Sequence, residues 1–178
     1  MRLQGPNGNV AAVDSTGRLA TLATALTADE VLLINGRAFV VYREALVVPG
    51  AGYFFYLRNL GALNLAIGGF SVLSSAATRI RLRWVSGSPT YTAASEAVFS
   101  NLRLNNPNQP QTEANWDTAI TGLTDEGTLA FESALTPNQR YSLDIPGGVS
   151  IPTGEAVALY TTAPATLTVL IQVGIITL

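Results

Sequence analysis

Apolar and polar residues alternate with a period of two along much of the chain after residue 36. Residues 78–85 read Thr-Arg-Ile-Arg-Leu-Arg-Trp-Val, and residues 166–169 read Thr-Leu-Thr-Val. Such alternation is typical of a β-strand with one buried face, because successive side chains of a strand point to opposite sides. No comparably long stretch follows the helical period. The pattern therefore predicts a chain built from strands.

Turn signals rich in Gly, Pro, Asn and Ser divide the chain into about ten strands. Short strands at this spacing are typical of a sandwich or barrel, and an eight-stranded jelly roll with extra edge strands fits the length best. The predicted fold class is an all-β, jelly-roll-like antiparallel β-sandwich. Gly68 and Gly69 interrupt one of the strands and predict a bulge or a close approach of another backbone segment there. The predicted strands are residues 37–44, 45–48, 52–58, 63–73, 78–85, 97–104, 118–121, 127–133, 139–145, 155–161 and 166–177.

The N-terminal residues do not share this pattern. Turn chemistry at residues 5–9 and 14–17 separates short segments of small residues, and no sustained amphipathic pattern links them. We predict an extended N-terminal arm over residues 1–30, followed by a sandwich domain over residues 31–178. The arm is expected to reach a neighbouring subunit or another surface.

The C-terminal residues 156–178 carry no charged side chain and are long enough to span a bilayer. Several threonines and Gln172 interrupt them, and residues 162–165 form a turn signal between two β-rich segments. We therefore predict a closing β-hairpin and no membrane partner.

The amino-acid composition excludes several classes of function. Charged residues make up 12% of the chain, about half the share of roughly 25% in average proteins. The net charge of −2 gives no basic footprint for nucleic acid. Cys and His are absent, and all ten cations are Arg. These absences exclude thiol and imidazole catalysis, Schiff-base chemistry and thiolate metal sites, so we expect no cofactor.

Three arginines share one face of a predicted strand. Arg79, Arg81 and Arg83 follow one another at intervals of two, so Ile80 and Leu82 between them face the core. One interpretation is a solvated face. The other is a ladder that pairs with carboxylates of a neighbouring subunit, since Arg is enriched at interfaces.

Aromatic residues offer further binding candidates. Tyr53 and Phe55 lie on a strand that is bulky on both faces, which is either central in a sandwich or partly covered by a neighbouring subunit. Trp116 falls in a predicted polar loop. Its ring there covers an end of the sandwich or a subunit contact or, together with Tyr91, stacks on a sugar. The interface candidates are Arg79, Arg81, Arg83, Tyr53, Phe55 and Trp116.

Carboxylates are the remaining candidates for catalysis, since a glycosidase needs only two acids about 5–10 Å apart. Glu113 and Asp117 flank Trp116, and Asp125 and Glu126 precede a glycine. All four fall in predicted loops, where acids are usually turn formers. The second pair lacks the ligand spacing of a calcium loop. We therefore expect no enzyme, no catalytic residue and no metal.

Several segments, taken in their order along the chain, resemble virion proteins of tailed bacteriophages. The group includes head cement (decoration) proteins and fibre-like proteins of the head or tail. The resemblance implies a trimeric jelly roll fixed on the exterior of the capsid, without catalysis. The segments that carry it are Gly5-Pro6-Asn7-Gly8-Asn9, Val13-Asp14-Ser15-Thr16-Gly17-Arg18-Leu19, Asn35-Gly36-Arg37-Ala38-Phe39, Leu57-Arg58-Asn59, Asn101-Leu102-Arg103-Leu104-Asn105, Ile120-Thr121-Gly122-Leu123 and residues 151–159.

The expected function is that of a non-enzymatic capsid cement protein. It binds the outer capsid surface as a homotrimer, contacts the major capsid protein and stabilises the head by bridging capsomers. The alternative is a receptor- or glycan-binding fibre or tail module of a phage virion. A carbohydrate-active enzyme is a third class, and fold alone does not separate the three.

Overall fold

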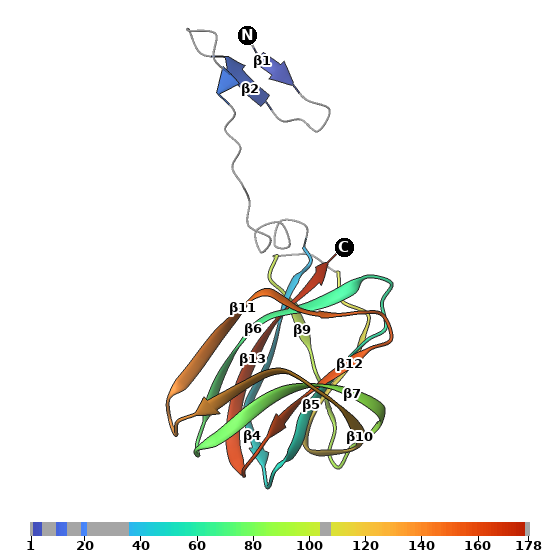
Figure 1. The fold of residues 1–178 in the computed structure, drawn as a ribbon, viewed down its shortest axis with the longest axis vertical. Coiled ribbons are helices and arrows are strands. Elements are labelled where there is room, and N and C mark those ends of the chain that lie inside the picture. Colours follow the sequence, from blue (N-terminus) through green and yellow to red (C-terminus); the bar gives the residue numbers. More distant parts are fainter. Residues whose placement is uncertain (1, 5–9, 14–18, 21–35, 104–107, 177–178) are drawn as a thin grey trace. The chain divides into compact units, whose positions relative to one another are not determined.

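The structure, a computed structural model, describes residues 2–4, 10–13, 19–20, 36–103 and 108–176 (Figure 1). Contacts divide the chain into two compact units, Met1–Val31 and Leu32–Leu178. The predicted turns at residues 5–9 and 14–17 lie outside the described residues. No helix occurs among the residues that are described.

The N-terminal unit contains three short strands: β1 (Arg2–Gln4), β2 (Val10–Val13) and β3 (Leu19–Ala20). They form an antiparallel sheet in the order β1-β2-β3. The predicted arm therefore contains paired strands of its own.

The second unit is a sandwich of two five-stranded antiparallel sheets. Sheet I has the order β11-β6-β13-β4-β9, and sheet II has the order β5-β12-β7-β10-β8 (Figure 1). The prediction of an all-β antiparallel sandwich is confirmed. The strands are β4 (Ala38–Val48), β5 (Gly52–Asn59), β6 (Asn64–Ser74), β7 (Thr78–Thr90), β8 (Ser95–Glu96), β9 (Phe99–Asn101), β10 (Thr112–Leu135), β11 (Arg140–Ile151), β12 (Ala156–Thr161) and β13 (Ala165–Ile176).

The eight long strands pair in a nested order. The first, β4, pairs with the last, β13, and β5 pairs with β12. Further inward, β6 pairs with β11 and β7 pairs with β10. Each pair is antiparallel, and successive pairs alternate between the two sheets. The chain thus has the strand pairing of one long β-hairpin, with its first four long strands in one arm and its last four in the other.

Strand β10 makes sheet II close on itself. Its residues 112–120 pair with β5, and its residues 121–135 pair with β7. Since β12 pairs with both β5 and β7, these four strands form a ring. A second apolar cluster gathers on these strands, away from the main core, and its buried members are Tyr56, Val85, Ile120, Ala156 and Ala158.

The main core lies between the two sheets. It combines alternate residues of sheet I, such as Phe39, Ile67 and Ile171, with residues of sheet II, such as Leu82 and Leu159. Alternation places these side chains inward and their neighbours outward, as the sequence predicts. The predicted bulge at Gly68 is confirmed, because the register of β6 with both of its neighbours shifts beside it.

Two predictions about strand boundaries are wrong. Residues 118–121 and 127–133 belong to one continuous strand, β10, because Gly122 and Gly127 adopt positive φ and sit at register shifts rather than at chain reversals. Residues 37–44 and 45–48 likewise form one strand, in which Ala45 has a φ of 49° beside a register shift. Bulges absorb the irregular residues that read as turns.

The predicted C-terminal hairpin is also wrong. Strand β12 pairs with β5 and β7 in sheet II, whereas β13 pairs with β4 and β6 in sheet I. Residues 162–164 therefore carry the chain from one sheet to the other. Both strands gain two neighbours by this crossing, which pairs their backbone groups on both edges.

Candidate interaction surfaces

The three candidate arginines lie on the outer face of sheet II. Ile80 and Leu82 of β7 point into the core, so Arg79, Arg81 and Arg83 project from the opposite face. The exposed fraction of the side chain falls along the row, from 59% at Arg79 to 27% at Arg81 and 22% at Arg83. The alternation predicted from the sequence is therefore present, and the face is only partly solvated.

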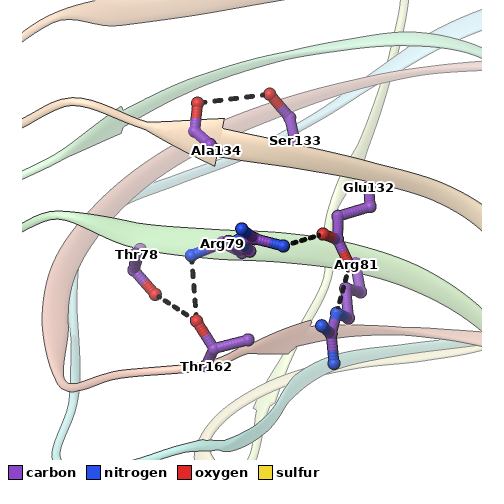
Figure 2. A network of polar contacts seen from close by, with 7 residues as sticks. All are labelled: Thr78, Arg79, Arg81, Glu132, Ser133, Ala134 and Thr162. Atoms are coloured by element: carbon purple, nitrogen blue, oxygen red, sulfur yellow. Dashed lines mark hydrogen bonds and ion pairs between the residues drawn. The ribbon is translucent and has the colours of Figure 1, made fainter.

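Carboxylates of the same chain pair with these arginines, and Figure 2 shows the pairing of Arg79 and Arg81 with Glu132. Glu132 of β10 accepts a hydrogen bond from Arg79 Nη1 at Oε1, over 2.7 Å, and another from Arg81 Nε at Oε2, over 2.5 Å. Arg83 forms an ion pair with Asp125. The hydrogen bonds from Arg81 and Arg79 hold the pKa of Glu132 below its ordinary value. The ladder thus has its acidic partners without a neighbouring subunit.

Tyr53 belongs to the same face. Its ring meets that of Tyr160 edge to face, with the centroids 5.1 Å apart, and the Arg83 guanidinium lies 6.0 Å from the Tyr160 centroid. Burial raises the pKa of Tyr53 above its ordinary value and that of Tyr56 to about 12. Neither phenol is therefore ionised near neutral pH.

Two other candidates are inside the core. Phe55 is fully buried and Trp116 is 1% exposed, and their ring centroids lie 4.3 Å apart. Trp116 lies within β10 rather than in a loop, opposite Phe55 in the strand register. Because this chain alone encloses both rings, neither is available to a partner subunit or to a sugar. The bulky strand β5 is covered on both faces by its own chain.

Asp117 is the most completely bonded acid of the candidate set. Its Oδ2 accepts hydrogen bonds from the N–H groups of Thr92 and Ala93, over 2.6 and 3.0 Å. Its Oδ1 accepts from the N–H groups of Thr118 and Ala119. Burial raises the pKa of Asp117, but these donors outweigh it and leave that pKa below its ordinary value. The carboxylate ties the segment after β7 to β10.

The prediction that the four candidate acids lie in loops is wrong, because Glu113, Asp117, Asp125 and Glu126 all belong to β10. Asp125 and Glu126 contact residues of β7. Asp125 accepts a hydrogen bond from the Gly127 N–H over 2.9 Å, in addition to its pairing with Arg83. Glu126 accepts one from the Ser86 hydroxyl. Within the described ranges, no cluster of three or more acidic side chains could hold a metal ion. The described residues include no helix that is long and apolar enough to cross a membrane.

A groove of about 690 Å³ lies at one end of the sandwich, between the β8–β9 segment and the start of β10. Apolar side chains of Leu60, Val98 and Phe99 line it, and Glu96 and Glu113 contribute its charge. Leu60 and Val98 are exposed. Sequence reasoning did not locate this groove, because it forms between segments that are far apart in the chain.

The residues that sequence reasoning missed are Glu132 and Tyr160. Glu132 pairs directly with Arg81 across the β7–β10 ladder, and Tyr160 pairs with Arg81 across the β7–β12 ladder. Both lie in predicted strands, so a correct strand pairing is the only signal that could have found them.

The protein is thus an antiparallel β-sandwich of two sheets, in which the arginines on the outer face of sheet II form ion pairs with acids of the same chain. Comparison of the chain with protein-family models, with curated proteins and with solved structures found no match.

Proposed function

We propose that the protein is a non-enzymatic decoration protein of a tailed-phage virion. It binds the outer surface of the capsid as a homotrimer, with the major capsid protein as its partner, and stabilises the head by bridging capsomers. The observation that carries this proposal is the nested strand pairing, in which β4 pairs with β13 and β7 pairs with β10. This pairing supports an eight-stranded jelly roll, an architecture used in viral capsids.

The jelly roll is the fold that the resemblance to cement proteins implies. The resemblance depends on short segments along the chain, whereas the pairing order depends on backbone geometry between distant strands. Their agreement supports the virion proposal more than either does alone. Fold by itself does not assign function, so the state of the polar side chains is the second support.

The polar side chains favour a structural role over catalysis. Asp117 has its oxygens bonded to backbone N–H groups, and Glu132 and Asp125 are paired with arginines. A general acid needs a raised pKa and a free proton, whereas Asp117 and Glu132 have lowered pKa values. These carboxylates stabilise the fold.

The same structure weakens the alternative of a glycan-binding fibre or tail module. A sugar platform needs exposed, coplanar rings. Trp116 is enclosed in the core. Tyr91, the other ring considered, is half-buried and accepts a hydrogen bond from Asn115 over 3.3 Å.

The proposal is tested with capsids of the phage that encodes the chain. Purified protein is mixed with expanded capsids that lack it, and the mixture is sedimented. We expect saturable binding to intact capsids and an increased resistance of the loaded capsids to heat. The same protein should not sediment with purified tails. Binding to tails or to host cells, without binding to capsids, would support the fibre alternative instead.

A further inference from the structure

The two sheets present very different outer faces. Sheet II carries the arginine row and its acidic partners on β7 and β10. In sheet I the two central strands, β6 and β13, contain no charged residue at all. Charged residues of its long strands occur only on β4 and β11, which flank the central pair. The outer face of sheet II therefore carries charges at its centre, whereas the centre of the outer face of sheet I, called the neutral face below, carries none.

The neutral face is a continuous array of small polar and apolar side chains. Across the four strands, Ser142, Ser71, Leu170 and Tyr42 follow one another as direct pairing partners. The hydroxyls of Ser142 and Ser71 bond to each other over 3.2 Å. Tyr42 is 52% exposed and the nearby Val47 58%. Exposed apolar groups on an uncharged sheet are typical of a surface that another protein covers.

The size of this face suits a stable interface. Strands β4 and β6 have 11 residues each, and β11 and β13 have 12 each. Four strands of this length cover about 700 Å², at roughly 4.8 Å between strands and about 3.4 Å per residue. Each partner of a standard interface contributes roughly 800 Å².

One row across the face has a charge of opposite sign at each border. The other exposed charge of β11, Asp144, lies on a different row, where its partner on β6 is Gly69. Arg140 of β11 pairs with Leu73, which pairs with Thr168. The Thr168 hydroxyl accepts a hydrogen bond from Ala45 N–H over 3.4 Å, and Glu44 precedes Ala45 on β4. Among the described residues, strand β9 pairs with residues 39–41 of β4, and no strand pairs with this edge of β4 at Glu44.

We propose that this neutral face binds a second copy of the same chain, with the β4 border of one copy against the β11 border of the next. Glu44 then meets Arg140 of the neighbouring copy. Such a head-to-tail contact forms a ring when the rotation between successive copies closes. The proposed trimer on the capsid sets the size of this ring at three, so that two neighbours share the face of each copy. The inference rests on the proposed function for that number only. The central strands β6 and β13 line the axis of the ring.

The test places a charge on the neutral face and measures the assembly of the full chain by sedimentation velocity. Leu170 is half-exposed, so we expect the fold to tolerate Leu170→Glu. Leu129→Glu, on β10 of the charged sheet, is the matched control because Leu129 is also exposed. We expect a trimer for the wild type and the control. For Leu170→Glu we expect a rise of about 100-fold or more in the dissociation constant, because a buried charge without a partner is costly. A Leu170→Glu protein that stays trimeric, or a monomeric wild type, overturns the proposal.

The border contact is tested by charge exchange. Glu44→Arg and Arg140→Glu should each weaken assembly, and the double variant should restore it, because the opposite charges meet again. Restoration also shows that the single variants fold. Failure of the double variant to recover overturns the head-to-tail arrangement. Capsid sedimentation separates the two proposals: a monomer that binds capsids contradicts this inference alone, and a trimer that ignores capsids contradicts the decoration role alone.

Discussion

Asp117 shows how a carboxylate can serve the fold rather than chemistry. It is 1% exposed and accepts hydrogen bonds from N–H groups on both sides of the β7–β10 connection. The sequence pointed to Asp117 as a loop acid, and its neighbours Thr118 and Ala119 are indeed among its donors. Thr92 and Ala93 could not be predicted, because they approach from a distant segment.

Replacement of Asp117 by Asn removes an ionised acceptor from these donors. We expect Asp117→Asn to lower the free energy of unfolding by about 1–3 kcal/mol, because buried N–H groups lose charged hydrogen-bond partners. Urea unfolding at neutral pH measures the change. Asp144→Asn, on the exposed border of β11, is the control and should stay near the wild type. If Asp117→Asn is as stable as Asp144→Asn, the charge of the Asp117 carboxylate is unimportant for the stability of the fold.

Glu132 gives a pH dependence with a definite sign. Its pKa is lowered in the folded protein, so its pairing stabilises the fold above the unfolded pKa of about 4.3. This contribution is lost as the pH falls through the folded pKa. We expect Glu132→Gln to melt below the wild type at pH 7 and level with it once the wild-type carboxylate is protonated.

Thermal melting from pH 7 to pH 2 checks this expectation. Glu155→Gln, an exposed acid before β12, serves as the control and should follow the wild type throughout. A Glu132→Gln deficit that persists unchanged to the acid limit would mean that the glutamate acts through packing rather than through its charge.

Strands β7 and β10 depend on glycines at their bulges. Gly87 and Gly122 both adopt positive φ, and a Cβ on Gly122 would lie 2.5 Å from the Ser88 carbonyl oxygen. The sequence Ser86-Gly87-Ser88-Pro89 read as a turn that ends the strand, yet β7 continues to Thr90. Gly is favoured at bulges and at turns for the same conformational reason, so composition alone does not separate them.

Gly122→Ala should therefore destabilise the protein. A non-glycine residue at positive φ costs about 1–2 kcal/mol, and displacement of the Ser88 carbonyl adds to this. Gly50→Ala is the matched control, because a Cβ there meets nothing within 4 Å and its φ is not positive. Urea unfolding of the two variants should separate them clearly. If Gly122→Ala is as stable as Gly50→Ala, the bulge geometry is incorrect.

Which strands exist was largely predictable, and which strands pair was not. Alternation placed β6, β7 and β12 within a few residues of their bounds, because burial on one face is a local pattern. The order of β12 and β13 was missed, because both are apolar and joined by a short turn that suits a hairpin equally well. Their partners β5 and β4 lie more than a hundred residues earlier, where no local signal identifies them.

At the scale of the whole molecule, the separation into two units has a direct consequence. Contacts divide the chain between Val31 and Leu32, and the described members of the core clusters of the sandwich all follow residue 36. A chain that begins at Leu32 should melt within about 3 °C of the full chain, the shift that about 1 kcal/mol causes at this size.

The same truncation tests the role of the N-terminal unit in attachment. If residues 1–31 contact the capsid, the truncated protein should stay folded but need a higher concentration to saturate capsids in the sedimentation assay. Circular dichroism on the same samples is the control for folding. Equal saturation curves for the two proteins would show that the sandwich alone makes the attachment.

The candidate surfaces were only partly predictable, because they depend on which strands pair and no local sequence signal identifies the partners. The arginine row follows from alternation, but its partners Glu132 and Asp125 and the burial of Trp116 follow from how β10 folds across sheet II. The neutral face of sheet I requires the order of four strands that are distant in the sequence.

The role proposed for this protein is decoration of the outside of a phage capsid. The decisive measurement is a cryo-electron microscopy map of virions of the phage that carries the gene. We expect trimers of the sandwich on the outer capsid surface where capsomers meet, with the sheet I faces toward the threefold axis. A map in which the sandwich is absent from the head, or in which it occupies only the tail, would contradict it.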